Sequence, residues 1–180
     1  MNIHSTSLPG VMLVAPRVFE DERGYFLETW RAERYREAGL PASFVQDNLS
    51  RSVRGTVRGL HYQVGTPQGK LVSVVRGAAF DVAVDLRRSA PSFGRWFGTV
   101  LSDENHAQLW IPEGFAHGFL ALSEVCDFAY KVTAPYAPAD ERCLRWDDPT
   151  VGIEWPAVEP KIVSPKDAAA PSLADAEVFA

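Results

Sequence analysis

Glycine and proline constrain this chain more than any other feature of its sequence. The 13 glycines and 13 prolines are spread along the whole length rather than pooled, so they divide the chain into short segments. Both residues disfavour the interiors of helices and strands, and the runs between them are rich in β-branched and aromatic residues. This pattern is typical of a many-stranded all-β domain and shows no internal repeat or linker.

The clearest predicted strand runs from Ala79 to Leu86, where apolar and small or acidic residues alternate with a period of two. We expect one alternating set, made up of Phe80, Val82, Val84 and Leu86, to face the core. The other set, which contains Asp81 and Asp85, should face a polar environment. Similar short runs predict further strands at Met12–Val18, Tyr25–Thr29, Ser43–Leu49, Thr56–Gln63, Lys70–Arg76, Trp96–Leu101, His117–Leu122 and Cys126–Thr133.

Eight or more short strands at this spacing predict a β-sandwich or jelly roll with few helices. Helix is expected at Arg31–Ala38, which Gly39 and Pro41 end, and at Leu173–Val178. The stretch after Trp155 is rich in proline and alanine, and we interpret residues 156–180 as a strap over the barrel surface. A length of 180 residues favours one domain over the whole chain.

Charge and hydropathy exclude several classes of partner. The 18 basic against 23 acidic residues give a net charge of -5, which does not favour binding to nucleic acid or to an anionic membrane. No signal peptide and no apolar run of about 18 residues is present, so we expect a cytoplasmic protein. Arginine supplies 14 of the 18 basic residues, which suits a local site for a small anionic ligand.

The two cysteines, Cys126 and Cys143, cannot form a disulfide framework. Neither has a Cys or His close by in the sequence, as a zinc site would show, so we expect two reduced thiols.

Four histidines can be weighed one by one. We expect His4 in a frayed terminus and His106 in a polar turn to be surface residues. His61 and His117 lie within predicted strands, where a hydrogen-bonded structural histidine is the default interpretation.

The stretch from Pro112 to His117 has the Pro-x-Gly-x-x-His spacing of cupin barrels, in which jelly-roll strands point histidines into the barrel mouth. A metal-binding cupin also supplies His-x-His and a nearby Glu in its first motif. Here that motif reads His61-Tyr62-Gln63, and Lys70 brings a positive charge. Too few ligands remain for a transition metal, so we expect none.

Without a metal, a histidine in a barrel mouth is most useful as a general base, which needs a carboxylate partner and a separate acid. Tyr130 shares a predicted strand face with Phe128 and Val132, and is equally well explained as a core residue. Lys70 begins a strand and is placed to stabilise an enolate oxygen, although a lone lysine is by default a surface charge. Spacing alone does not assemble these residues into a site.

Taken together, nine short motifs resemble the metal-free, cupin-type family of dTDP-4-dehydrorhamnose 3,5-epimerases over nearly the whole chain. The matching stretches are Phe19 with Asp21–Phe26, Phe44–Asn48, Val57–His61, Gln68–Leu71, Phe80–Asp85, Leu109–Phe119, Tyr130-Lys131, Gly152–Pro156 and Lys166–Pro171. Each motif alone is weak, but their common order makes a chance match implausible.

The resemblance implies a jelly-roll homodimer that needs no cofactor and binds a dTDP-sugar. The implied reaction is epimerisation of dTDP-4-dehydro-6-deoxy-D-glucose at carbons 3 and 5, beside its ketone. It implies His61 as the base, Asp167 from the strap as the partner that orients it, Tyr130 as the acid on the opposite face and Lys70 as the stabiliser of the enolate.

The same resemblance implies further residues around the sugar nucleotide. These are Arg23, Glu28, Gln46, Asn48, Arg58 and His117, with Phe19 and Phe26 as apolar walls and Tyr136 as a cover. His117 is matched together with Asp81.

Three points stay open at this stage. Relatives often have neighbouring aromatic residues where this chain has Ala134-Pro135-Tyr136, so a 3- or 5-monoepimerase is an alternative. A non-catalytic sugar-nucleotide-binding cupin and a metal-dependent cupin are others, although His61, Tyr130 and Asp167 are all present and no second ligand histidine adjoins His61. Finally, strict alternation puts Arg58 and His61 on opposite strand faces, so we expect a bulge at Gly59.

Overall fold

A computed structural model describes all of residues 1–180 and shows an all-β protein with two short helices. The strands are β1 (Asn2–Ser5), β2 (Met12–Ala15), β3 (Val18–Asp21), β4 (Gly24–Leu27), β5 (Gln46–Val53), β6 (Thr56–Gln63), β7 (Lys70–Arg76), β8 (Ala78–Asp85), β9 (Trp96–Ser102), β10 (Gln108–Ile111), β11 (Phe115–Ala121), β12 (Val125–Val132), β13 (Glu141–Cys143) and β14 (Ile162–Val163). The helices are α1 (Ala32–Glu37) and α2 (Pro165–Ala168).

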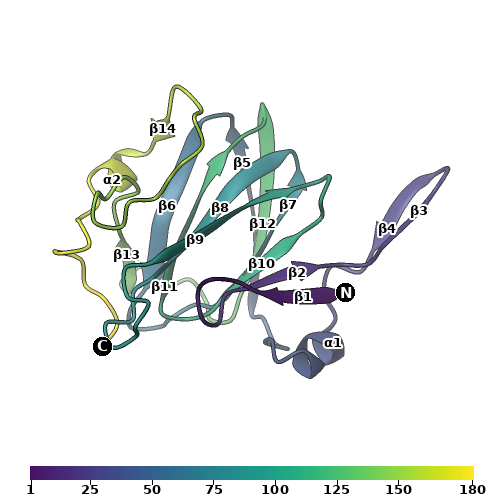
Figure 1. Cartoon of the computed structure of the whole chain (residues 1–180), viewed down its shortest axis with the longest axis horizontal. Coiled ribbons are helices and arrows are strands. Elements are labelled where there is room, and N and C mark those ends of the chain that lie inside the picture. Colours follow the sequence, from purple (N-terminus) through teal and green to yellow (C-terminus); the bar gives the residue numbers. More distant parts are fainter.

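Two sheets face each other across the molecule (Figure 1). The first has the strand order β1-β2-β10-β7-β12-β5, and the second has the order β13-β6-β11-β8-β9, with β14 added in parallel to β6. All other pairings in the two sheets are antiparallel. The prediction of a cupin-type jelly-roll sandwich is confirmed.

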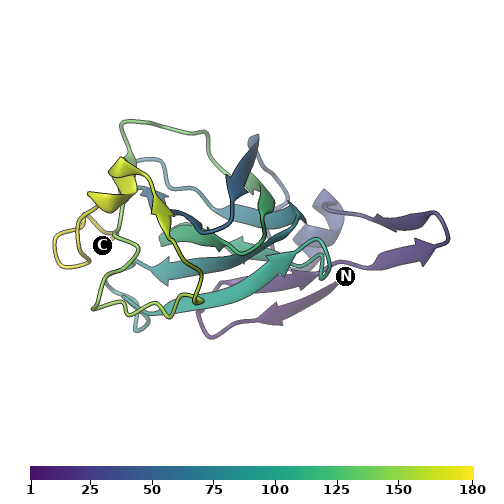
Figure 2. The same ribbon diagram turned by 90° about the horizontal axis from the view of Figure 1, so that it is seen from above.

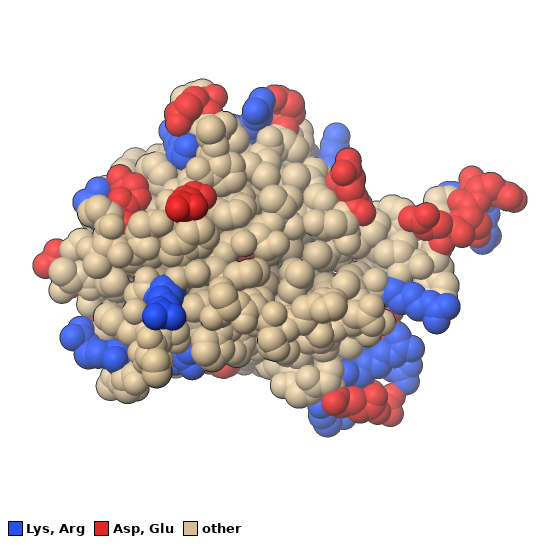
Figure 3. Space-filling view, viewed as in Figure 1, with Lys and Arg blue, Asp and Glu red and all other residues tan.

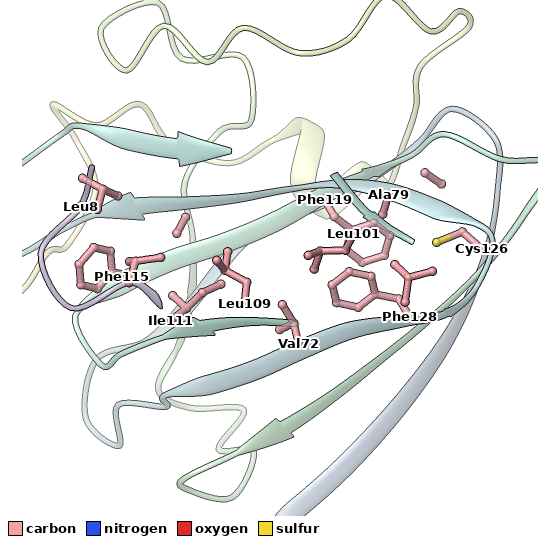
Figure 4. Close-up of a cluster of buried hydrophobic side chains, with 14 residues drawn as sticks. Leu8, Val72, Ala79, Leu101, Leu109, Ile111, Phe115, Phe119, Cys126 and Phe128 are labelled. Atoms are coloured by element: carbon pink, nitrogen blue, oxygen red, sulfur yellow. The ribbon is translucent and has the colours of Figure 1, made fainter. Parts of the chain in front are cut away.

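The main hydrophobic core fills the space between the two sheets (Figure 4). Phe119 of β11 stacks on Phe128 of β12 with ring centroids 4.1 Å apart, so these two rings mark the inner faces of the two sheets. Because paired residues on neighbouring strands share a face, this contact fixes which side of each strand points inward.

Strand β8 reverses the orientation that its alternation predicts. Val82, Val84 and Leu86 pack outward, against a second core that the C-terminal part of the chain covers through Leu144, Val151 and Leu173. Ala79 and Ala83 belong to the core between the sheets, and Asp81 pairs with Phe119 on this inner face. The predicted polar face is therefore wrong, because Asp81 and Asp85 are fully buried.

The predicted irregularity at Gly59 is confirmed. His61 pairs with His117 and Arg58 pairs with Phe119, so two residues of β6 lie opposite Gly118 alone. Gly59 has φ +118°, and a Cβ there would lie 2.7 Å from Gly118 Cα, so only glycine fits. The extra residue brings Arg58 and His61 onto the same inward face.

The predicted helix at Leu173–Val178 is wrong, because this segment forms turns. Backbone groups in and next to this segment bond to other parts of the chain. Leu173 N donates to Asp148 Oδ2, and Phe179 N donates to the Leu86 carbonyl. A helix forms earlier, where Ser164 caps α2 by accepting from Asp167 N and Pro165 occupies the first turn. This arrangement of capping serine and proline is a recognisable start signal.

Several other predicted elements differ from the observed ones at their ends. The predicted strand Met12–Val18 is split into β2 and β3 around Pro16, which cannot donate to a ladder. Helix α1 ends before Gly39, near its predicted end. His4 lies in strand β1, paired with Leu13, rather than in a frayed end. Strands β1, β10, β13 and β14 are too short for their alternation to be recognised.

Strands β3 and β4 form a separate hairpin, here called the arm, which projects from the side of the molecule opposite α2 (Figure 1, Figure 2). On the face seen in Figure 3, basic side chains are interspersed with acidic ones rather than gathered in one basic patch. Neither helix is long enough to cross a membrane.

Candidate active site

His61 and Asp167 form a hydrogen-bonded pair where the C-terminal segment meets β6. His61 Nε2 lies 2.7 Å from Asp167 Oδ1, and the His61 side chain keeps 33% of its surface exposed while Asp167 is buried. Asp167 is held by helix α2, so residues 106 positions apart in the chain are brought together. A carboxylate at this nitrogen fixes the ring orientation and leaves Nδ1 free of the pair.

The Asp167 carboxylate is stabilised in its charged form. Burial raises its pKa, but the hydrogen bond and charge of His61 and the N–H group of Gly59 outweigh burial, so the pKa lies below its ordinary value. The Gly59 N–H donates to Asp167 Oδ2 at 3.3 Å. The bulge that reorients Arg58 therefore also supplies a hydrogen bond to the carboxylate.

A second histidine–aspartate pair lies beside the first. His117 Nε2 is 2.7 Å from Asp81 Oδ1, and the side chains are only 9% and 0% exposed. Burial lowers the pKa of His117, against the opposing effect of Asp81. The His117 ring stacks on Phe128, and Asp81 Oδ2 has no hydrogen-bond partner.

Lys70 reaches from β7 in the first sheet to β6 in the second. Its Nζ donates to the His61 carbonyl at 3.2 Å, and the side chain is buried. Burial lowers the pKa of Lys70 to about 8, despite the nearby charges of Asp81 and Glu141. The ammonium group is thus held beside His61, where it can act on a developing negative charge.

Tyr130 faces the pairs from the opposite sheet. It lies on the same face of β12 as Phe128, and burial raises the pKa of its hydroxyl, with Arg58 opposing. Asn48 and Gln46 of β5 pair with Tyr130 and Val132 and point inward with them. Arg58 donates to Ser52 Oγ and to the Arg51 carbonyl. Six residues predicted from the sequence therefore share one interior with His61 and Asp167: Gln46, Asn48, Arg58, Lys70, His117 and Tyr130.

Tyr136 lies in a loop at the edge of this interior, and glutamine side chains hold that loop. Gln63 donates to the Pro135 carbonyl and accepts from Ala137 N, and Gln46 accepts from Tyr136 N at 3.0 Å. Hydrogen bonds to the backbone of residues 135–137 thus hold Tyr136 at this edge.

Three neighbours of the site have no role in the prediction from sequence. Glu141 accepts from the Tyr136 hydroxyl at 3.0 Å and contacts the Lys166 ammonium. Burial raises the pKa of Glu141, but Lys166 and Tyr136 outweigh it and lower the pKa overall. Cys143 pairs with His61 across β13 and β6. Of the three, only Lys166 lies in one of the matching family motifs, Lys166–Pro171.

The arm residues are not brought to this interior. Phe19, Arg23 and Phe26 lie on the β3–β4 hairpin, where Phe26 is 69% exposed and Arg23 pairs with Asp21. Glu28 follows the arm and contacts Arg34 of α1 at 3.1 Å. Within one chain, these four residues are separate from His61.

The arrangement suits removal and return of a proton at carbon. One sheet presents an accessible imidazole oriented by a carboxylate, the other presents a phenol, and a buried ammonium donates to the His61 carbonyl. A proton beside a carbonyl can be removed when the resulting enolate is stabilised, and these groups provide a base, an acid and a cation for that purpose.

Comparison with known proteins identifies close relatives. Residues 5–175 match the family model of dTDP-4-dehydrorhamnose 3,5-epimerase. A dTDP-4-dehydrorhamnose 3,5-epimerase of Pseudomonas aeruginosa is 53% identical over 174 residues, covering 96% of each chain.

Solved structures of similar proteins are also epimerases. The dTDP-6-deoxy-D-glucose-3,5-epimerase of Legionella pneumophila, in complex with dTDP-4-keto-L-rhamnose, is 51% identical with a TM-score of 0.94, covering 96% of this chain and 93% of that one. A 3'-monoepimerase of Streptomyces bikiniensis in complex with dTDP-quinovose is more distant, at 35% identity and a TM-score of 0.89, covering 95% and 87%.

Proposed function

The chain belongs to the dTDP-4-dehydrorhamnose 3,5-epimerase family, and from this premise we infer that it epimerises dTDP-4-dehydro-6-deoxy-D-glucose at carbons 3 and 5. The product is dTDP-4-dehydro-L-rhamnose, an intermediate of dTDP-L-rhamnose biosynthesis. The family match spans residues 5–175, and the similar Legionella structure holds the product nucleotide sugar. The enzyme is an isomerase that moves protons only.

We propose that His61 is the base and Asp167 the residue that orients it. The observation that carries this assignment is the 2.7 Å contact from Asp167 to Nε2 of a histidine that remains one-third exposed. With Nε2–H donated to the carboxylate, Nδ1 holds the lone pair that takes the substrate proton. In this proposal residues 1–180 act as one unit, because the strap 156–180 supplies Asp167 to the barrel.

Lys70 and Tyr130 complete the proposed reaction. Removal of the proton from carbon 3 or 5 places negative charge on the oxygen at carbon 4, and the Lys70 ammonium stabilises it. Inversion requires a new proton on the opposite face. Tyr130 approaches from the sheet opposite His61, and its raised pKa keeps the hydroxyl protonated at neutral pH.

Polar side chains around these groups provide the proposed grip on the sugar nucleotide. Gln46, Asn48 and His117 point into the same interior, while Arg58 offers a guanidinium for the diphosphate. Tyr136 at the rim presents a half-exposed ring for stacking. A monoepimerase that inverts one carbon is the second candidate, because the similar Streptomyces protein has that activity.

We further propose a homodimer, because four residues expected at the substrate lie on or beside the arm. Phe19, Phe26 and Tyr25 are exposed on the arm, and Leu49, Val53 and Val75 are exposed on the first sheet. Val75 and Tyr25 also line a shared hollow at the base of the arm. A second copy covering this surface buries these apolar side chains and can receive the arm beside its own site.

The test is incubation with the 4-keto sugar nucleotide in deuterated water, with NMR reading of exchange and inversion at each carbon. The wild-type protein is expected to incorporate deuterium and invert at both carbons. Inversion and exchange confined to one carbon would support the monoepimerase instead, and no exchange at either carbon would leave only a binding protein.

Tyr130→Phe separates the two halves of the reaction. The variant keeps the ring and its packing, so His61 still forms the enolate and deuterium still enters by return on the same face. Inversion should fall by about a hundredfold to ten-thousandfold, the usual contribution of a general acid. If exchange and inversion both stay near wild type, Tyr130 is a packing residue, and Tyr136 is the next candidate acid.

A further inference from the structure

Cys143 has no part in the proposed reaction, yet it lies against the catalytic pair. Strand β13 pairs with β6 so that Cys143 is opposite His61. Its Sγ is 4.0 Å from Asp167 Oδ1, the same oxygen that lies 2.7 Å from His61 Nε2. One nitrogen, one oxygen and one sulfur from these three residues all lie within 4.8 Å of one another.

This donor set has the composition of a zinc site. Zn²⁺ binds imidazole nitrogen, carboxylate oxygen and thiolate sulfur at about 2.0 to 2.3 Å in a tetrahedron, so neighbouring ligand atoms lie roughly 3.3 to 3.6 Å apart. The distances of 2.7 Å from His61 Nε2 to Asp167 Oδ1 and 4.0 Å from Cys143 Sγ to that oxygen lie on either side of this range, and the His61 nitrogen and Cys143 sulfur lie within 4.8 Å of each other. Side-chain movements of less than about 1 Å bring the three atoms to those separations, and the exposed edge of His61 leaves the fourth position to water.

We propose that Cys143, Asp167 and His61 form a site for a thiophilic divalent cation such as Zn²⁺, and that its occupation inhibits the epimerase by capturing the base. The binding of metal stands on the geometry alone. The inhibition rests on the function proposed for His61.

Inhibition follows whichever nitrogen of His61 binds the metal. A metal on Nδ1 blocks the lone pair that takes the substrate proton. A metal on Nε2 replaces the proton shared with Asp167, and the neutral ring then carries its proton on Nδ1, where it is no longer a base. In either case the Cys143 thiol releases one proton to solvent as the sulfur–metal bond forms, and no oxidant or reductant is needed.

Nearby charges set the conditions for binding. Lys70 and Lys166 face Cys143 and oppose a cation, while Asp167 and Glu141 favour one.

Co²⁺ provides a direct probe, because a cobalt–thiolate bond absorbs in the near ultraviolet. Titrated into the wild-type protein, Co²⁺ should give this band with one equivalent bound. Cys143→Ser should abolish it. Cys126→Ala is the matched control, since it removes the other thiol, which is buried in the core away from His61, and should keep the band. A band that persists in Cys143→Ser, or none in the wild type, overturns the site.

Activity gives the second readout. Zn²⁺ should inhibit the wild-type epimerase, EDTA should restore it, and Cys143→Ser should need at least about tenfold more Zn²⁺ for the same inhibition. Equal sensitivity of the two proteins overturns the role of Cys143. If the wild type lacks epimerase activity, the proposed function fails, and the cobalt spectra still decide whether the metal site exists.

Discussion

The two histidine–aspartate pairs have the same local geometry and different surroundings. His61–Asp167 and His117–Asp81 each join Nε2 to Oδ1 at 2.7 Å, and the two histidines are paired across β6 and β11. The His61 side chain is 33% exposed and the His117 side chain 9%. Asp167 comes from helix α2, outside the sheets, whereas Asp81 lies on β8 within the second sheet.

We propose that access, rather than pairing, separates the base His61 from the structural histidine His117. Burial lowers the pKa of His117, and its ring is fixed against Phe128. His61 remains one-third exposed, and the Lys70 ammonium donates to its backbone carbonyl. We therefore assign proton removal to His61, and assign His117 to the wall beside the sugar.

Among variants outside the two histidines, the largest effect is expected for Lys70→Met, which keeps most of the side-chain length and removes the charge. Loss of one group that stabilises a developing oxyanion typically slows a reaction by about 10²- to 10³-fold. The measurement is deuterium exchange into the substrate at pH 7. Exchange within threefold of wild type would show that Lys70 is only a structural link between the sheets.

Lys70→Met should also change how kcat/KM depends on pH. Because the active form of Lys70 is the ammonium and its pKa is about 8, kcat/KM of the wild type should fall as pH rises through about 8. Lys70→Met should lack this alkaline limb.

Replacing either aspartate with asparagine should slow deuterium exchange less than Lys70→Met does, and by a different amount in each variant. Asp167→Asn disturbs the tautomer and orientation of His61 and should slow exchange by a factor on the order of a hundred. Asp81→Asn, measured at pH 7, should leave exchange within about tenfold of wild type, because the Asp81 side chain hydrogen-bonds only to the buried His117. Equal losses in the two variants would remove the distinction between the pairs.

The smallest expected effect is the dependence of stability on pH. The folded-state pKa of His117 lies below its ordinary value of 6.5, so the unfolded chain binds the proton first. Its contribution is present above pH 6.5 and is lost as pH falls toward the lower pKa, by at most about 1.4 kcal/mol per pH unit. Urea unfolding of wild type and His117→Gln between pH 7 and 5.5 should show a shallower slope for the variant. Parallel slopes would show that His117 does not titrate on unfolding.

The fold was predictable because alternation and turn residues mark most long strands. Strands β6 and β7 have the predicted bounds, and the bulge at Gly59 follows from the need to align Arg58 with His61. The orientation of β8 was not predictable, since a strand covered on both sides has no polar face to identify. Its large residues face the strap, which contributes a second core that alternation does not reveal.

The site was predictable only in part. Family motifs indicated His61, Asp167, Lys70 and Tyr130, but spacing alone could not bring the strap to β6. The place of Cys143 beside His61 was not predicted, because it arises from strand pairing between residues 82 positions apart. The arm residues have matching motifs, yet one chain does not bring them to the site.

The most direct test of the account compares His61→Gln with His117→Gln. Each glutamine keeps an amide donor for its aspartate and removes the basic nitrogen, so the two variants are matched. Deuterium exchange at carbons 3 and 5, normalised to folded protein, should fall by about 10²- to 10⁴-fold in His61→Gln and by less than about tenfold in His117→Gln. Near-normal exchange in folded His61→Gln, or a larger loss in His117→Gln, would contradict the assignment of His61 as the base.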